Sequence, residues 1–434
     1  MEAPRRRVVV IGAGYVGLVT AVGLAELGHT VELTERRPDR LAALRSGRVP
    51  IHEPGLQTAF EQALTAGRLS VSERPTIGAE VAMVCVGTPI GPDGQSDLGQ
   101  LRTALADLAP VLGPQVPLVI RSTLPPGGTQ LVIAWAGVPA AQVVTNPEFL
   151  RQGSALADFR QPSRIVVGRS PSAAPETFAL VIDLYDRIET PRLVVDVASA
   201  ELIKNGANAF LALKLSFANE LAGMAETYGA DIDDVLGGIA IDPRIGSQYL
   251  RPSFGFGGSC LPKELLVLAA SGAARGLPMQ VATAASAANA TSQARFAARI
   301  AEALGGLERR RVAMLGLAFK AGTDDVRNSP AIAVSAALLD GGAEVVGYDP
   351  QANGNAAAEL PGLRVADGAA AALAGADAAV IATEWPEFAV LDWASLRPTM
   401  RQSLVLDGRR LLDGQRLRAL GYRYLAVGSP ETAP

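Results

Sequence analysis

The sequence has few of the residues that form disulfide frameworks and metal sites. Its 434 residues include two cysteines, Cys85 and Cys260, and two histidines, His29 and His52. Two cysteines cannot build the multi-bridge scaffold of small secreted domains, and this set of side chains does not supply a typical zinc site. We therefore expect no metal in the functional site.

A strong charge of one sign and long apolar runs are also absent. The chain has 39 Lys and Arg against 43 Asp and Glu, and no basic tract appears beyond Arg5 to Arg7. This excludes the electrostatic footprint of a nucleic-acid-binding protein. No apolar run reaches the ~20 residues that a membrane span needs, and the N-terminus leads directly into an apolar strand pattern. We expect a cytoplasmic protein without nucleic-acid or membrane partners.

Lysine is scarce although arginine is abundant. The only lysines are Lys204, Lys214, Lys263 and Lys320. Because ammonium and guanidinium differ in hydration, geometry and pKa, a lysine retained in such a sequence hints that a compact amine is needed there.

Length and hydrophobic content predict two or three globular domains. Strand-like apolar runs alternate with helical patterns up to about residue 190 and again from Arg311 onward, which predicts parallel sheets with crossover helices. A helical pattern without proline runs from about Ser199 to Tyr228, and an Ala-rich helical segment covers roughly 280–304. We expect an α/β fold of two Rossmann-like doubly wound domains joined by a long central helix. The expected domains are 1–198, 199–304 and 305–434.

A dinucleotide-binding pattern lies between the first strand and the first helix. The turn Gly12-Ala13-Gly14-Tyr15-Val16-Gly17 follows the apolar run 8–11, and Glu35 ends the next strand. The glycines permit a tight turn and a close approach of the pyrophosphate, while the acid accepts hydrogen bonds from the ribose. Glu35 favours NAD as cofactor, although Arg36 and Arg37 are suited to the 2′-phosphate of NADP. We expect Gly12, Gly14, Tyr15, Val16, Gly17 and Glu35 to bind NAD.

The two cysteines have different surroundings in the sequence. Cys260 directly follows the glycine-rich segment Phe254-Gly255-Phe256-Gly257-Gly258-Ser259, where exposed backbone can approach a ligand. Cys85 lies in an apolar strand, where a small buried hydrophobic residue is expected. Cys260 is therefore the expected reactive thiol.

Several ordered motifs together resemble one known family. They are the GAGYVGL stretch from Gly12, His52 to Leu56, Cys85 to Pro89, Arg121 to Thr123, Asn146 to Arg151, Glu201 to Phe210, Arg244 to Gly246, Phe254 to Lys263, Gly316 to Arg327 and Asp407 to Arg409. Over nearly its whole length the chain is similar to the UDP-glucose/GDP-mannose dehydrogenases. The resemblance implies an NAD-binding domain and a nucleotide-sugar-binding domain flanking a long helix that forms a homodimer.

The resemblance also implies roles for individual residues. Cys260 becomes the nucleophile that captures an aldehyde, Lys204 and Asn208 the pair that stabilises the oxyanion, and Glu148 the base for thioester hydrolysis. Thr123 becomes the cofactor-site hydroxyl that organises water. From the residues alone, Lys204 would be a solvated helix charge, Glu148 an ordinary loop carboxylate and Thr123 a turn cap.

The remaining implied site residues fall into two groups. Further cofactor contacts are Arg40, Thr88, Thr123 and Arg327. Substrate contacts are Phe149, Leu150, Arg151, Lys204, Asn208, Arg244, Tyr249, Phe254, Gly257, Lys320 and Arg409, with Arg410 as an alternative to Arg409. Arg244 resembles the arginine that reaches the active site from the partner subunit.

Two positions depart from the family pattern. Gln152 stands where a second glutamate is usual, and Glu264 stands where an aspartate is usual after the cysteine. Both are expected in the catalytic set, but Gln152 cannot act as a carboxylate base, and Glu264 carries its charge on a longer stem. A slower or more specialised enzyme is therefore left open.

The expected reaction is the four-electron oxidation of UDP-glucose, or a closely related nucleotide glucose, to the uronate with two NAD. dTDP-glucose and GDP-mannose remain alternative substrates. A one-step hydroxyacid-type dehydrogenase is disfavoured, because it would lack both the second α/β domain and the cysteine loop. An inactive nucleotide-sugar binder stays open through Gln152 and Glu264.

Overall fold

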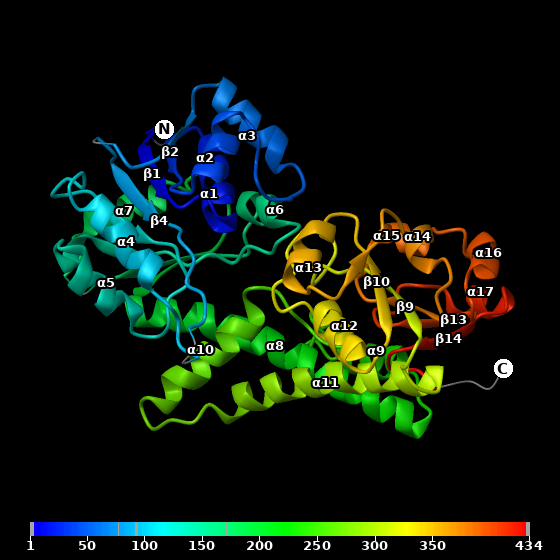
Figure 1. Ribbon diagram of the computed structural model, residues 1–434. Helices are drawn as coiled ribbons and strands as arrows, with labels where there is room; N and C mark the ends of the chain where they lie inside the picture. Colours follow the sequence, from blue (N-terminus) through cyan, green and yellow to red (C-terminus); the bar gives the residue numbers. More distant parts are fainter. Residues whose placement is uncertain (1–3, 77, 92–93, 171, 431–434) are drawn as a thin grey trace. The chain divides into compact units, whose positions relative to one another are not determined.

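The computed structural model describes residues 4–76, 78–91, 94–170 and 172–430, and the chain forms two compact units (Figure 1). Unit 1 contains the residues up to Ala207 together with Ala270–Leu277. Unit 2 contains Asn208–Ala269 and the residues from Pro278 onward. Each unit is built around its own largely parallel sheet, as the alternating sequence pattern predicts, whereas the three domain boundaries expected from the sequence remain a prediction.

Unit 1 holds an eight-stranded sheet in the order β3-β2-β1-β4-β5-β6-β7-β8. Its strands are β1 (Arg7–Ile11), β2 (Thr30–Thr34), β3 (Leu69–Ser72), β4 (Val81–Val84), β5 (Leu118–Ile120), β6 (Val143–Thr145), β7 (Ile165–Arg169) and β8 (Arg192–Asp196). The pairing of β6 with β7 is antiparallel, and the other pairings are parallel. In the register of the sheet, Val10 of β1 pairs with Leu33 and with Met83.

Helices cover both faces of this sheet. They are α1 (Tyr15–Glu26), α2 (Pro38–Arg45), α3 (Leu56–Thr65), α4 (Gly99–Leu108), α5 (Gly128–Ala136), α6 (Ala155–Arg160) and α7 (Pro175–Asp183), with a 3-10 turn at Ala140–Gln142. Val8 and Val10 pack with α1, α3 and α6, whereas Val9 and Ile11 pack with α4 and α5. Successive side chains of a strand point to opposite faces, so an uninterrupted apolar run belongs to a strand buried on both sides.

Unit 2 holds a six-stranded parallel sheet in the order β11-β10-β9-β12-β13-β14. Its strands are β9 (Arg311–Leu315), β10 (Glu344–Tyr348), β11 (Arg364–Val365), β12 (Ala378–Ile381), β13 (Leu404–Asp407) and β14 (Arg423–Ala426). Its helices after β9 are α12 (Pro330–Asp340), α13 (Asn353–Glu359), α14 (Ala369–Leu373), α15 (Pro386–Ala389), α16 (Trp393–Leu396) and α17 (Gly414–Ala419), with a 3-10 turn at Arg397–Thr399. These strands and helices confirm the second α/β region.

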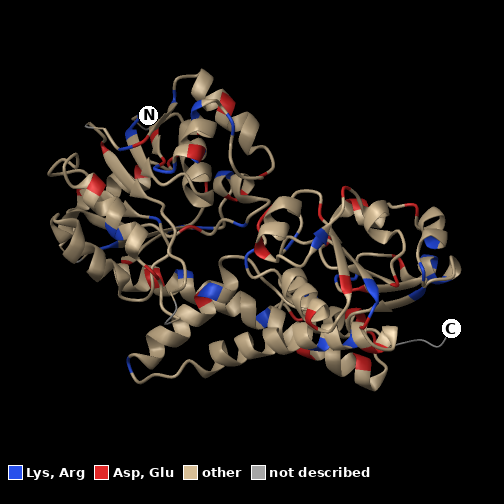
Figure 2. Cartoon of the chain, in the orientation of Figure 1, with Lys and Arg blue, Asp and Glu red and all other residues tan. Residues whose placement is uncertain are grey.

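The stretch between the two sheets is helical. It contains α8 (Val197–Tyr228, 32 residues), α9 (Ile232–Ala240), α10 (Leu261–Ala273) and α11 (Gln280–Leu304, 25 residues). The expected long helix and the Ala-rich helix are both confirmed. Although these helices are long, none among the described residues is apolar enough over its length to cross a membrane. Figure 2 shows acidic and basic residues interspersed along the chain, in keeping with the net charge of -4.

Candidate active site

The glycine turn of unit 1 leaves its backbone open. Gly12 has φ +96°, and its N–H donates to Thr34 O of the neighbouring strand at 3.1 Å. A Cβ added at Gly17 would lie 1.8 Å from Gly12 O, so only glycine permits this contact between helix and turn. At Gly14 an added Cβ would meet nothing within 4 Å, and no side chain caps the start of α1 there. The open space over an uncapped helix N-terminus fits a pyrophosphate.

The acid at the end of β2 lies beside two arginines that are already paired. Glu35 is buried, and its Oε1 accepts the N–H of Arg37 at 2.9 Å. Arg36 pairs with Asp107 at 3.3 Å, and Arg37 pairs with Asp39 at 2.8 Å. Both guanidinium groups are thus held by carboxylates, which supports the expectation of NAD over NADP.

A buried ion pair joins two of the predicted catalytic residues. Lys204 Nζ of α8 donates to Glu148 Oε1 at 3.1 Å, and both side chains are about 95% buried, with exposures of 4% and 5%. Burial by itself raises the pKa of Glu148, but Lys204, the Leu150 amide and Arg121 outweigh it and lower that pKa. Glu148 is therefore ionised at neutral pH and can accept a proton. The alternative of a solvated helix charge at Lys204 is wrong.

Two buried networks that the sequence did not single out involve residues next to this pair in the chain or on the same helix. Arg121 donates to Asn146 Oδ1 at 2.8 Å, to the Tyr185 hydroxyl at 3.1 Å and to the Thr20 hydroxyl at 2.9 Å. Glu201, on the same helix as Lys204, accepts the N–H of Gly127 at 2.6 Å and the N–H and hydroxyl of Thr129. The sequence analysis included Arg121 and Glu201 only as members of family motifs, because the local sequence does not show which distant groups they contact.

The loop after Glu148 carries predicted substrate contacts. The Phe149 ring lies under the Arg164 guanidinium, whose carbon is 3.7 Å from the ring centroid, and Lys204 Nζ is 5.4 Å from that centroid. Arg151 pairs with Asp158 at 2.7 Å. Leu150 and Gln152 are half-buried.

The carboxylate of Glu53 anchors the end of that loop. It accepts the N–H of Gly153 at 2.6 Å and the N–H of Ala155 at 2.7 Å, and the Tyr15 hydroxyl also accepts from Gly153. The Tyr15 hydroxyl thereby ties the predicted substrate loop to the start of α1, which lies beside the glycine turn, and Glu53 ties it to the segment before α3.

The other predicted cofactor residues of unit 1 lie at the ends of neighbouring elements. The Thr88 hydroxyl, which follows β4, donates to Thr123 O, which follows β5, at 2.8 Å. Val16 lies in the first turn of α1, and Arg40 is half-buried on α2. Parallel strands bring such residues to one sheet edge, where ligands of open α/β sheets bind.

In unit 2 the loop before Cys260 packs tightly against the segment before α12. Gly258 N donates to Arg327 O at 3.0 Å, and an added Cβ at Gly257 would lie 2.1 Å from Asn328 O. Cys260 is half-buried directly before α10, with the Ser259 hydroxyl 3.7 Å from its sulfur. The thiol stands at a helix N-terminus, where backbone N–H groups favour a thiolate.

Two charged residues lie close to this thiol. Glu264, in the first turn of α10, is fully buried. Arg327 pairs with Asp325 at 2.6 Å, and this hydrogen bond raises the pKa of Arg327, with a smaller contribution from the charge of Cys260. Arg327 is thus a cation held near Cys260 by its own carboxylate partner.

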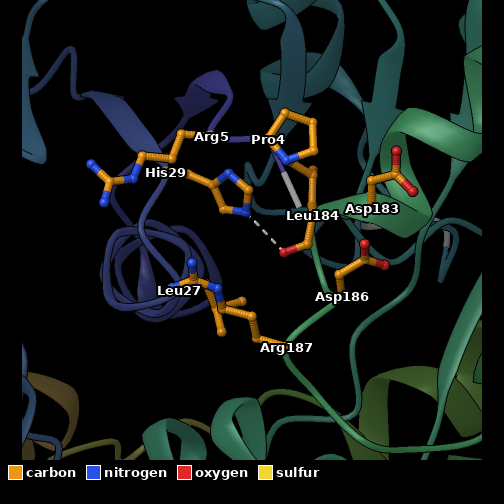
Figure 3. A pocket seen from close by; sticks show the side chains of 8 residues that line it. All are labelled: Pro4, Arg5, Leu27, His29, Asp183, Leu184, Asp186 and Arg187. Atoms are coloured by element: carbon orange, nitrogen blue, oxygen red, sulfur yellow. Dashed lines mark hydrogen bonds between the residues drawn. The ribbon is translucent and has the colours of Figure 1, made fainter. Parts of the chain in front are cut away.

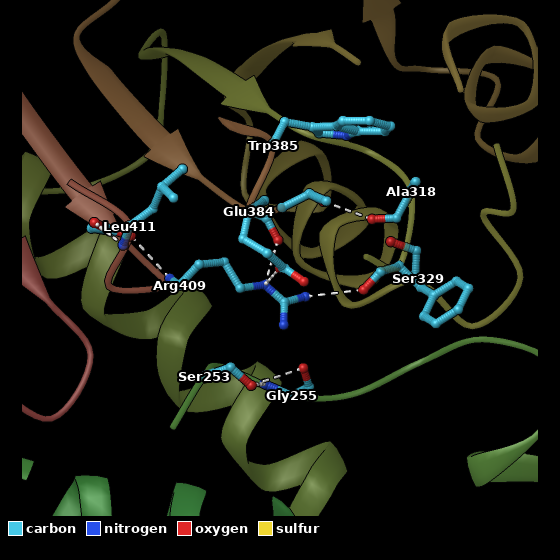
Figure 4. A network of polar contacts seen from close by, with 12 residues as sticks. Ser253, Gly255, Ala318, Ser329, Glu384, Trp385, Arg409 and Leu411 are labelled. Carbon is cyan, nitrogen blue, oxygen red and sulfur yellow. Dashed lines mark hydrogen bonds and ion pairs between the residues drawn. The ribbon is translucent and has the colours of Figure 1, made fainter. Parts of the chain in front are cut away.

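The structure separates Arg409 from Arg410. The Arg409 guanidinium donates to Ala382 O at 2.8 Å and to Phe319 O at 3.3 Å, and it lies 5.1 Å from the ring centroid of Phe254. It also lies 3.5 Å from the Glu384 carboxylate (Figure 4). Burial lowers the pKa of Arg409.

Arg410 instead pairs with Asp231 and Asp233 at 2.9 and 2.6 Å. Of the two arginines, only Arg409 therefore contacts the Phe254 ring, which belongs to the loop that carries Cys260.

The remaining predicted substrate residues of unit 2 are more scattered. Lys320 Nζ lies 5.8 Å from the Phe319 ring centroid, and Asn208 is half-buried four positions after Lys204 on α8. Arg244 pairs with Asp242 and is 87% exposed, and Tyr249 adopts the left-handed backbone with φ +60°. Arg244 therefore lies at the surface of the chain.

The two cysteines differ as expected. Cys85 is buried after β4, and burial raises the pKa of its thiol to about 12. Among the described residues no cluster of three or more His, Cys, Asp or Glu side chains is placed to hold a metal ion.

A small pocket of unit 1 lies around His29 (Figure 3). It is lined by Pro4, Arg5, Leu27, His29, Asp183, Leu184, Asp186 and Arg187. It includes none of the predicted site residues.

Comparison with known protein families gives three matches. The UDP-glucose/GDP-mannose dehydrogenase family matches through its NAD binding domain over residues 6–189, its central domain over 198–291 and its UDP binding domain over 313–414.

Individual proteins are similar over nearly the whole chain. A UDP-glucose 6-dehydrogenase of Pseudomonas aeruginosa is 39% identical over 98% of both chains. The UDP-glucose 6-dehydrogenase AglM of Haloferax volcanii is 40% identical over 96% of this chain and 99% of its own. The structure of a UDP-glucose dehydrogenase from Pyrobaculum islandicum superposes with a TM-score of 0.87, at 37% identity and 98% coverage of both chains.

Proposed function

Because this chain belongs to the UDP-glucose/GDP-mannose dehydrogenase family and is an NAD-dependent dehydrogenase, we propose that it oxidises UDP-glucose to the uronate. The reaction consumes two NAD and one water per sugar. The observation that carries the proposal is the buried Lys204–Glu148 pair at 3.1 Å, together with a thiol on a glycine-rich loop. An alcohol dehydrogenase that stops at the aldehyde needs no nucleophile.

The residues of unit 1 fit the cofactor. The open space at Gly14 and the uncapped start of α1 suit a pyrophosphate, and Glu35 is placed to accept ribose hydroxyls. NAD bound there supplies a hydride acceptor for C6 of the sugar. Arg36 and Arg37, each held by a carboxylate, favour a cofactor without a 2′-phosphate.

The protein side chains carry the remaining chemistry. After the C6 alcohol has lost one hydride and one proton, the Cys260 thiolate adds to the aldehyde carbon and forms a thiohemiacetal. Lys204 and Asn208, four positions apart on one helix face, stabilise the oxyanion. Loss of a second hydride gives the thioester. Glu148 then takes a proton from water, which attacks the thioester, releasing the carboxylate and regenerating the thiol.

The homodimer belongs to the same proposal. Phe210, Phe217 and Met224 recur every seven residues on α8 and are 61%, 49% and 52% exposed. Such a stripe on a long helix suits a second copy of the chain. Light scattering of the wild type and of Phe217→Glu tests this, since a monomeric wild type contradicts it.

Substitution of the thiol tests the reaction. Cys260→Ser should abolish formation of the acid while NAD still binds, and Cys85→Ala serves as the control for loss of a thiol outside the site. Wild-type acid production by Cys260→Ser would rule out the covalent route.

Stoichiometry and substrate comparison test the alternatives. Two NADH per sugar support the proposal, one NADH indicates a one-step dehydrogenase, and none indicates an inactive binder. We expect the highest kcat/KM with UDP-glucose among UDP-glucose, dTDP-glucose, GDP-mannose and UDP-N-acetylglucosamine. A higher kcat/KM with dTDP-glucose or GDP-mannose would identify that sugar nucleotide as the substrate and leave the proposed type of reaction unchanged.

A further inference from the structure

The turn that follows β9 in unit 2 starts like the dinucleotide turn of unit 1. Gly316 has φ +94°, against +96° for Gly12. Its N–H donates to Tyr348 O at 2.7 Å, as the N–H of Gly12 donates to Thr34 O at 3.1 Å. Both first glycines thus leave the central strand in the same way and bond to the end of the neighbouring strand.

After this first glycine the two turns diverge. In unit 1 the helix begins at Tyr15, directly after the turn, and its first N–H groups have no side-chain cap. In unit 2 the segment Leu317–Ser329 intervenes before α12, and the first residue of that helix is Pro330, which has no N–H. A helix N-terminus that could stabilise a phosphate is therefore missing at the second turn.

The carboxylate of Asp349 occupies the N–H groups of the second turn. Asp349 follows β10 and is 1% exposed. Its Oδ2 accepts from Leu317 N at 2.7 Å, Ala318 N at 3.0 Å and Trp385 Nε1 at 3.0 Å. Its Oδ1 accepts the N–H groups of Gln351 and Ala352, both at 2.9 Å. One buried carboxylate thus receives five donors, a set that would suit a phosphate oxygen equally well.

Further backbone groups of this turn, from Leu317 to Phe319, are also bonded within unit 2. Phe319 N donates to Asp325 O at 3.1 Å. The carbonyl oxygens of Leu317, Ala318 and Phe319 accept from the Ser329 hydroxyl at 2.7 Å, the Thr383 hydroxyl at 2.6 Å and Arg409 Nη2 at 3.3 Å. The N–H and C=O groups of Leu317, Ala318 and Phe319 are therefore already occupied within unit 2.

We propose that Asp349 is an internal anion that takes the place of a ligand phosphate at the second turn and fixes the shape in which this turn meets the nucleotide sugar. The proposal rests on the proposed function for the identity of that ligand. Asp349 is a positioning residue, because it acts through the turn that carries Phe319 and Lys320. The same turn seats the cysteine loop, since an added Cβ at Gly258 would lie 2.8 Å from the Phe319 ring.

Hydrogen exchange tests the internal anion without any ligand. The amides of Leu317 and Ala318 should be protected in the protein alone and should exchange at least about 10-fold faster in Asp349→Asn, because an amide group places a donor against these N–H groups. The amides that begin α1 should instead gain protection only when NAD is added. If Leu317 and Ala318 exchange freely until UDP is added, they are ligand donors and the proposal is wrong.

Binding measurements test the positioning role. In Asp349→Asn the Kd of UDP and the KM of UDP-glucose should rise at least about 10-fold, while kcat at saturation and the Kd of NAD stay within about 3-fold. Trp385→Phe removes one of the five donors and should raise the same Kd and KM by a smaller factor. It serves as the test variant if Asp349→Asn does not fold.

The matched control is Asp377→Asn. Asp377 is 4% exposed at the opposite, amino end of the same sheet, where it accepts Arg311 N at 2.8 Å. This variant should lower the unfolding temperature of unit 2 without changing the Kd of UDP. If both variants weaken UDP binding equally, Asp349 contributes only to the stability of unit 2, and the proposal is wrong. A wild type that binds no UDP would refute the proposed function, while hydrogen exchange would still decide the role of Asp349.

Discussion

The glycine turns of the two α/β regions have the same backbone geometry at their first glycine but differ in what completes them. In unit 1, Gly12 leads directly into α1 and the helix N-terminus is uncapped, so a bound anion can complete the turn. In unit 2, Gly316 leads into a long segment, and Asp349 completes the turn from within. The comparison teaches that a dinucleotide-type turn is open to a phosphate only where no side chain already occupies its N–H groups.

The largest expected effect is on the folding of the second turn. An alanine at Gly316 would place Cβ 2.3 Å from Thr383 Cβ and 2.6 Å from its backbone nitrogen, at φ +94°. We expect Gly316→Ala to destabilise unit 2 by about 3 kcal/mol or more. The unfolding temperature of unit 2, monitored by hydrogen exchange of its amides, measures this loss of stability. Gly354→Ala is the control, because its Cβ would meet nothing within 4 Å, and equal unfolding temperatures for the two variants would contradict the prediction.

The next effect separates binding from folding at the first turn. Gly14 has φ -73°, and its Cβ position is open, so alanine fits the folded chain. The added methyl group occupies the space that the pyrophosphate needs, and the Kd of NAD should rise roughly 100-fold in Gly14→Ala. Calorimetry should show an unchanged Kd of UDP and an unchanged unfolding temperature. Tight NAD binding by this variant would place the cofactor elsewhere.

A smaller effect concerns cofactor choice. Replacing Glu35 by serine removes an acceptor for the ribose hydroxyls and a negative charge beside Arg36 and Arg37. The ratio of kcat/KM for NAD to that for NADP should fall at least about 10-fold. Asp39→Asn, which removes the carboxylate partner of Arg37 but keeps Glu35, should lower the ratio by a smaller factor, about 2. If Asp39→Asn shifts the ratio as far as Glu35→Ser does, Arg37 and not Glu35 decides the preference.

The smallest expected effect is a difference between unit 1 and unit 2 in how their stability changes at acidic pH. His29 Nδ1 accepts the N–H of Arg6 at 3.2 Å and Nε2 lies 3.0 Å from Leu184 O, so the neutral ring carries its proton on Nε2 (Figure 3). Burial lowers the pKa of His29 from 6.5. The unfolded chain therefore binds a proton more readily than the folded chain, and unit 1 should lose stability as pH falls below about 6.5.

Unfolding temperatures measured between pH 7.5 and pH 5 test this acid sensitivity. His29→Gln should flatten the decline of unit 1, whereas His52→Gln should leave it as in the wild type. In unit 2, burial raises the pKa of Asp407, so protonation of that group favours the folded state at low pH. A decline of equal size in both units would show that His29 is not its source.

Part of the site follows from local sequence. The glycines of the first turn, the acid after β2 and the thiol after a glycine-rich loop could all be identified, because each depends on backbone geometry within a few residues. The alternation of strands and helices and the length of α8 are local for the same reason. Lys204 could not be read in this way, since its partner Glu148 lies 56 residues earlier in the chain.

What the sequence by itself determined is the α/β architecture, the dinucleotide turn and the family motifs, because periodicity and glycine spacing act over one element at a time. Only the tertiary structure decided that Arg409 lies on Phe254 while its neighbour Arg410 turns to Asp231 and Asp233. It also decided that Asp349 fills the second turn. Each of these outcomes is a pairing of a buried charge with groups from distant elements, and such a partner is set by packing in three dimensions.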